Sequence, residues 1–124
     1  MNQQTSQEML AGMLNKELYV ALRQPADISK MSDLLSSHLH WAVAAEGRGE
    51  LFASGPFAKP GSPPGFGGGM TILRAESVDH AMKILEKDPF IAQGVFTVEV
   101  RKWVVMEGSV TLTVRFSDQS SRLL

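Results

Sequence analysis

The chain has no cysteine, no excess of either charge and no long apolar run. The absence of cysteine excludes disulfides, thiolate metal sites and cysteine nucleophiles, and it fits a reducing compartment. Twelve basic and 13 acidic residues leave a net charge of −1, which gives no reason to expect nucleic acid as a partner. No run approaches the ~20 apolar residues of a membrane span, and no signal peptide is visible, so we expect a soluble, cytoplasmic protein.

The 124 residues, of which 44% are hydrophobic, fit a single domain with a real core. Alternating hydrophobicity predicts five strands, at residues 17–23, 50–57, 70–75, 96–105 and 109–116. Three- and four-residue spacing predicts two helices, at about 28–46 and 77–87, and a polar tail follows from 117. This order is the ferredoxin-like split βαβ arrangement of the α+β class, plus one strand, with helices on one face of an antiparallel sheet.

A further short helix is predicted from Thr5 or Ser6, where an apolar stripe begins. It is either an added docking helix or a frayed terminus.

The sheet face without helices is also apolar in this arrangement. The residues expected there are Tyr19, Ala21, Ala53 and the neighbourhoods of Met70 and Val98. So short a chain has no second helical layer to cover them. A homodimer that packs sheet against sheet would bury this face.

Two residues far apart in the sequence are candidates for acid–base chemistry. Asp88 precedes Pro89 where a helix is predicted to end, and a carboxylate is unfavourable beside the negative end of a helix dipole. His38 lies on the first long helix, and imidazole exchanges protons near neutral pH. As a pair, His38 would move a proton while Asp88 orients the ring and stabilises its charged form.

Each candidate also has a purely structural interpretation. A helix histidine often bonds a backbone carbonyl, and an aspartate before proline readily forms a turn that holds the following backbone amides. Asp88 can also do both. A catalytic pair requires the His38 ring within about 2.6–3.2 Å of the Asp88 carboxylate, inside a cleft.

Four other residues are candidates for substrate binding. Tyr19 and Ser54 can hydrogen-bond a substrate oxygen, although ordinary strand roles remain open for both. Gly55 and Pro56 allow the backbone to bend or approach a ligand. The Pro- and Gly-rich segment at 59–69 is either a lid or a flexible hairpin connection, and it lacks the GxGxxG pattern of a nucleotide loop.

The remaining histidines, His40 and His80, are expected on the surface. His40 lies about 200° around the helix from His38, so the two rings do not share a face. The three histidines therefore do not predict a metal site.

The ordered set of features resembles the YciI-like, YCII-related family of the dimeric α/β-barrel group. The matching pieces are His38, Gly55-Pro56, Gly68 to Ile72, Ser77 to Ala81, Asp88 to Phe96, and Val100 to Trp103. The resemblance covers about residues 17–104 of one domain spanning 1–124, leaving an N-terminal extension at 1–16 and an extra strand and tail at 105–124. It implies a ferredoxin-like monomer, a dimer, and a pocket that holds a His–Asp pair. One relative is a dehydrochlorinase.

Two functions are compatible with these residues. The first is a cofactor-independent lyase or isomerase, in which His38 and Asp88 transfer a proton on a small oxygenated ring or carbonyl compound. The second is a non-catalytic small-molecule-binding or accessory module on the same dimeric scaffold. In both cases we expect a homodimer and a small-molecule ligand, without a metal, a cofactor, nucleic acid or a membrane.

Overall fold

The computed structural model describes residues 3–123. Met1, Asn2 and Leu124, the outermost residues of the two predicted extensions, lie outside the described residues. Contacts divide the chain into two compact units. The larger is Glu17–Val104, and the smaller combines the segments before and after it.

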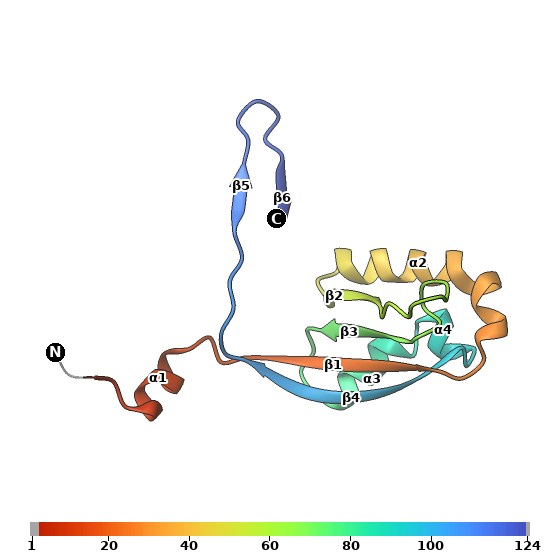
Figure 1. Ribbon diagram of the computed structural model, residues 1–124, viewed down its shortest axis with the longest axis horizontal. Helices are drawn as coiled ribbons and strands as arrows, with labels where there is room; N and C mark the ends of the chain where they lie inside the picture. Colours follow the sequence, from red (N-terminus) through yellow and green to blue (C-terminus); the bar gives the residue numbers. More distant parts are fainter. Residues whose placement is uncertain (1–2, 124) are drawn as a thin grey trace. The chain divides into compact units, whose positions relative to one another are not determined.

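The larger unit is built on a four-stranded sheet of order β2-β3-β1-β4 (Figure 1). The strands are β1 (Lys16–Pro25), β2 (Leu51–Pro56), β3 (Gly69–Leu73) and β4 (Phe96–Val105). Strand β3 runs antiparallel to both β1 and β2. This order confirms the predicted ferredoxin-like fold.

Three α-helices complete this unit. They are α2 (Met31–Gly47), which follows the 3-10 turn η1 (Ile28–Lys30), α3 (Val78–Leu85) and α4 (Pro89–Ala92). Ser77 caps α3 by accepting a hydrogen bond from the His80 amide, so the helix begins where the sequence predicts it. Within residues 3–123, none of the helices has both the length and the apolar character that crossing a membrane requires.

The core lies between the sheet and these helices. Its buried members are Tyr19, Ala21, Ala45, Leu51, Leu73, Ala81, Ile84 and Leu85. Tyr19 and Ala21 therefore face the helices, which corrects the expectation that they lie on the opposite face. Val98 also packs against this cluster. Both faces of β1 are apolar, so alternation alone could not decide which face meets the helices.

The opposite sheet face carries the other residues of the same strands. Its cross-strand pairs are Val20 with Ile72 and Leu22 with Met70. All four side chains are apolar and buried or half-buried. The structure therefore keeps an apolar face on the side away from the helices. Ala53 and Met70 lie there as expected, whereas Val20, Leu22 and Ile72 take the places expected for Tyr19, Ala21 and Val98.

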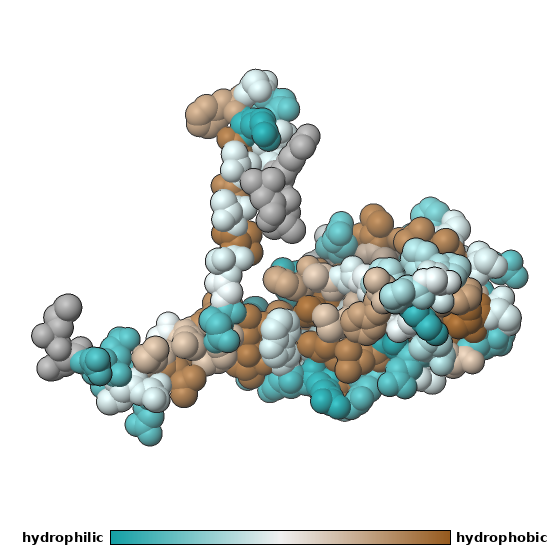
Figure 2. Space-filling model, in the orientation of Figure 1, coloured by the Kyte–Doolittle hydropathy of each residue, from teal (hydrophilic) through white to brown (hydrophobic). Residues whose placement is uncertain are grey.

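The smaller unit contains α1 (Ser6–Gly12) and a hairpin of β5 (Leu112–Val114) and β6 (Ser121–Leu123). The predicted fifth strand at 109–116 is thus shorter and pairs with β6, inside the predicted polar tail. The reason is local, because Asp118 accepts hydrogen bonds from Ser120 and forms the turn between the strands. Apolar and polar residues alternate along residues 109–116, which contain β5 (Figure 2).

Candidate active site

The site begins with the short helix α4, which is fixed at both ends. Asp88 is its N-cap, and its Oδ1 accepts the Phe90 amide at 3.0 Å. Pro89 occupies the first turn, where its missing N–H costs nothing. At the other end Gly94 has a φ of 75°, and the Val95 amide bonds the Phe90 carbonyl at 2.9 Å, closing a Schellman motif. These caps hold the Asp88 carboxylate in one position.

His38 meets this carboxylate from helix α2. Its Nδ1 lies 2.7 Å from Asp88 Oδ1, although 50 residues separate the two in sequence. The imidazole also stacks on the Phe90 ring, with centroids 4.1 Å apart and planes 10° from parallel. His38 is 8% exposed and Asp88 1%. The ring is therefore held in one orientation by a hydrogen bond and an aromatic neighbour.

Asp88 serves as a turn anchor and as the partner of His38, through the same oxygen. Helix α3 does end just before Asp88, at Leu85, as expected, but Asp88 also starts a further helix, α4, which the sequence did not predict. A carboxylate at a helix N-terminus is favoured by the helix dipole. The Asp-Pro pair is in fact the common N-cap and first-turn signature, which a sequence reader can recognise.

His38 lines a cavity of about 670 Å³ between α2, the ends of β1 and β2, and the Pro/Gly-rich loop. Other residues around it are Arg23, Met31, Leu35, Leu39, Ser54, Gly55, Pro56, Phe66, Phe90 and Phe96. The structure thus brings Ser54, Gly55 and Pro56 together with His38. Tyr19 is absent from this wall, since it is buried in the core between the sheet and the helices.

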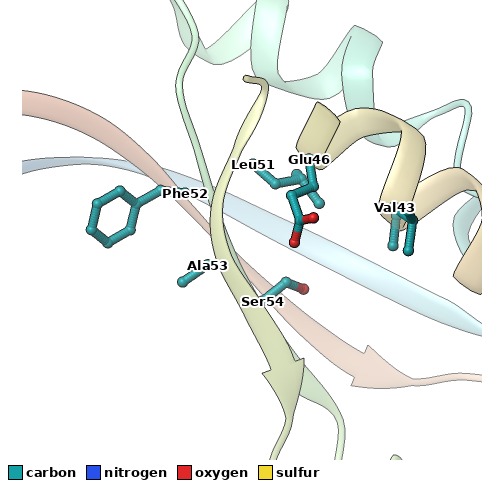
Figure 3. Close-up of a pocket in the computed structure, with 7 residues that line it drawn as sticks. Val43, Glu46, Leu51, Phe52, Ala53 and Ser54 are labelled. Carbon is teal, nitrogen blue, oxygen red and sulfur yellow. The ribbon is translucent and has the colours of Figure 1, made fainter. Parts of the chain in front are cut away.

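Ser54 reaches the cavity because β2 is irregular. Its register against β3 shifts between Leu51 and Ala53. Figure 3 shows Phe52 and Ala53 on one side of the strand, and Ser54 on the side of α2. The Ser54 hydroxyl lies 2.9 Å from the Thr71 hydroxyl. Either hydroxyl can be the donor of this hydrogen bond.

The Pro/Gly-rich segment connects β2 to β3 and forms part of the cavity wall through Pro63, Pro64 and Phe66. It is therefore a hairpin connection that contributes to the site. The sequence also missed Arg23, whose guanidinium lines the same cavity and donates from Nη2 to the Gly55 carbonyl at 2.9 Å. An arginine at the end of an apolar strand was the only available signal.

The other two histidines lie elsewhere. His40 is exposed and bonds the Ser36 carbonyl at 2.8 Å. His80 is exposed as well, and its Nδ1 accepts the Glu76 amide. Within the described part of the chain, no three histidine, aspartate or glutamate side chains gather as metal ligands would.

Comparison with known proteins agrees with this architecture. The YCII-related domain matches residues 17–104. Among solved structures, the chain is similar to 5-chloro-2-hydroxyhydroquinone dehydrochlorinase from Burkholderia phenoliruptrix AC1100, in complex with 2,5-dihydroxybenzoquinone. The TM-score is 0.58 at 24% identity, over 69% of this chain and 92% of that one, so the likeness shows a shared fold. No curated protein matches the chain. Because the domain match spans the whole of the larger unit, the chain belongs to the YCII-related family.

Proposed function

We propose that this protein is a small enzyme that transfers protons on an oxygenated ring or carbonyl compound, with His38 as acid and base. The observation that carries the proposal is the 2.7 Å contact between His38 Nδ1 and Asp88 Oδ1, in the wall of a largely apolar cavity. An ionised Asp88 accepts the Nδ1 proton, which leaves Nε2 with a free lone pair. Nε2 is then the base.

The reaction follows from what such a base can do. Nε2 takes a proton from a carbon next to a carbonyl. The electron pair of the broken C–H bond forms a C=C bond, and the carbonyl π electrons move onto the oxygen, which gives an enolate. Returning the proton to another carbon completes an isomerisation. Alternatively, the electron pair expels a halide anion and completes an elimination. Neither route oxidises or reduces the substrate, so proton transfer is all that the pair must supply.

Replacing His38 with glutamine is expected to lower turnover by about 10²- to 10⁴-fold, because the base is lost. The substrate is sought among small phenols, lactones and halogenated quinols, starting with 5-chloro-2-hydroxyhydroquinone. Binding is followed with 2,5-dihydroxybenzoquinone through tryptophan fluorescence, since the Trp41 ring lies 6.1 Å from that of His38.

His40→Gln is the matched control, because this exposed histidine lies two residues away on the same helix. It should leave turnover and binding unchanged. Melting curves of both variants separate loss of function from loss of fold. Saturable binding of 2,5-dihydroxybenzoquinone with no turnover of any compound would favour the alternative, a non-catalytic binding module. A large loss of stability in His38→Gln with unchanged ligand affinity would contradict both.

We further propose that the protein is a homodimer through the apolar sheet face. In a β-sheet, one uncovered apolar face requires a partner surface. Sedimentation at micromolar concentration should give twice the chain mass of 13.5 kDa. Val20→Lys places a charge opposite Ile72 in the middle of this face and should give a monomer. Glu86→Lys, on the exposed end of α3, should remain dimeric, and a monomeric wild type would refute the proposal.

A further inference from the structure

Arg23 is a cation set into the wall of the His38 cavity. It ends up there because β1 alternates, which turns Arg23 to the same side as Ala21 and towards the helices. The residue is only 7% exposed. Its guanidinium carbon lies 5.8 Å from the centre of the Phe96 ring.

The hydrogen-bonding capacity of this guanidinium is largely unused. A guanidinium has five N–H donors. Arg23 donates from Nη2 to the Gly55 carbonyl, whereas its buried Nε has no acceptor among residues 3–123. A buried donor without an acceptor costs free energy, so its retention calls for a partner.

The charge of Arg23 also lacks a direct counter-ion. No ion pair in the described part of the chain includes it. Burial lowers the pKa of the Arg23 guanidinium, and the charge of Asp88 offsets this only in part. Asp88 is already engaged by His38 and the Phe90 amide. Arginine nevertheless stays charged at neutral pH, so the cavity wall holds a cation that an anion can neutralise.

The rest of the wall is apolar and aromatic. Phe90, Phe96 and Phe66 line the cavity, together with Leu35 and Pro56. Such walls favour a flat ring or a short apolar body over a strongly hydrated ion. The cavity therefore combines one charged anchor with surfaces suited to a planar compound.

We propose that Arg23 binds an anionic oxygen of the substrate, so that the site selects small planar organic anions. The oxygen is either a carboxylate or an ionised enol or phenol, because both present a planar acceptor to a guanidinium. This inference rests on the proposed function, since it names the substrate class of the same cavity. Arg23 is a binding residue, and His38 remains the proton-transfer group.

Matched pairs of ionised and neutral probes test the inference on the full-length protein by calorimetric titration. Benzoate against benzamide examines a carboxylate. The 2,5-dihydroxybenzoquinone anion against 2,5-dimethoxybenzoquinone examines an enolate oxygen. At least one ionised probe is expected to bind 10-fold or more tightly than its neutral partner, and the pair that shows this identifies the oxygen.

Arg23→Gln should weaken binding of that ionised probe by roughly 10- to 100-fold, the usual value of a hydrogen bond to a charged group. Its neutral partner should lose no more than about twofold, because the apolar walls are unchanged. Arg23→Lys keeps the charge but not the planar guanidinium with its paired donors. Its affinity for the ionised probe should lie between those of wild type and Arg23→Gln. A melting curve of each variant checks that it folds.

Failure of this inference is distinguishable from failure of the proposed function. His38→Gln should retain the preference for the ionised probe, even if no compound is ever turned over. Wild-type protein that binds neither ionised probe, or binds ionised and neutral probes equally, overturns the role of Arg23. An equal loss of affinity for the ionised and the neutral probe in Arg23→Gln overturns it as well, since that outcome indicates a purely structural residue.

Discussion

Asp88→Asn is expected to separate the two tasks of this carboxylate, by abolishing most of the turnover while leaving the fold stable. Asparagine is as good an N-cap as aspartate, so the Phe90 amide keeps its acceptor and α4 its start. An amide cannot stabilise a positively charged His38 ring as a carboxylate does. We expect turnover to fall by about 10²- to 10⁴-fold and the free energy of unfolding by about 1 kcal/mol or less.

Asp88→Ala is the contrasting variant, because it removes both tasks. The helix loses its cap, and two buried donors, the Phe90 amide and His38 Nδ1, lose their common acceptor. Losing the cap, which is the hydrogen bond from the Phe90 amide, costs about 0.5–2 kcal/mol, and the His38 donor left without an acceptor costs about 1–3 kcal/mol. Because the surrounding structure can relax, we expect the free energy of unfolding, measured in urea, to fall by about 2–4 kcal/mol.

Nitrogen NMR of the His38 ring gives a readout that needs no substrate. In wild-type protein the Nδ1 atom should carry the proton, because Asp88 is its acceptor. In Asp88→Ala this preference should disappear. Full turnover in Asp88→Asn would show that the carboxylate acts only as a cap. Equal destabilisation by both substitutions would show instead that its charge, rather than its capping geometry, holds the fold.

The sequence predicted the four strands and the helices α2 and α3 of the larger unit because local patterns specify them, whereas it did not predict the short α4. Strand β4 was predicted at residues 96–105, where the structure has it, and α3 lies within the helix predicted at about 77–87. Their order then leaves few arrangements, because connections are short and the helices must cover one face. The fold class is therefore readable without any tertiary information.

The sequence could not decide features that depend on the balance between two similar surfaces. Tyr19 and Ala21 face the helices, although Val20 and Leu22 are equally apolar and a shift of one residue would exchange them. The C-terminal segment is a similar case. Alternation around Leu112 indicates a strand but says nothing about its partner, which is β6 rather than the main sheet.

The position of Arg23 depends on contacts between three strands that no local pattern records. Its side chain bonds the Gly55 carbonyl of β2 by crossing Gly69 of β3, the residue directly opposite it in register. The passage is open only because Gly69 has no Cβ. The glycine-rich loop end was predicted as flexible, whereas this glycine also provides the space for the cation.

Gly69→Ala is therefore expected to be strongly destabilising, by about 2–4 kcal/mol. A Cβ at this position would collide with Arg23 Nη2 and lie 2.7 Å from the Gly55 carbonyl oxygen. The guanidinium can move only by giving up its bond to Gly55, and the carbonyl belongs to the paired strand β2. Urea unfolding at neutral pH measures the effect directly.

Gly55→Ala is the matched control, because the same hydrogen bond ends on its carbonyl but an added Cβ there would meet nothing within 4 Å. We expect the free energy of unfolding to change by less than about 1 kcal/mol in either direction. Combining Gly69→Ala with Arg23→Gln isolates the contribution of the guanidinium. If Arg23 causes most of the collision, the double variant should be more stable than the sum of the single losses predicts. Strict additivity would place the strain in the backbone of β2 instead, and an unchanged Gly69→Ala would mean that Arg23 does not cross β3 at this residue.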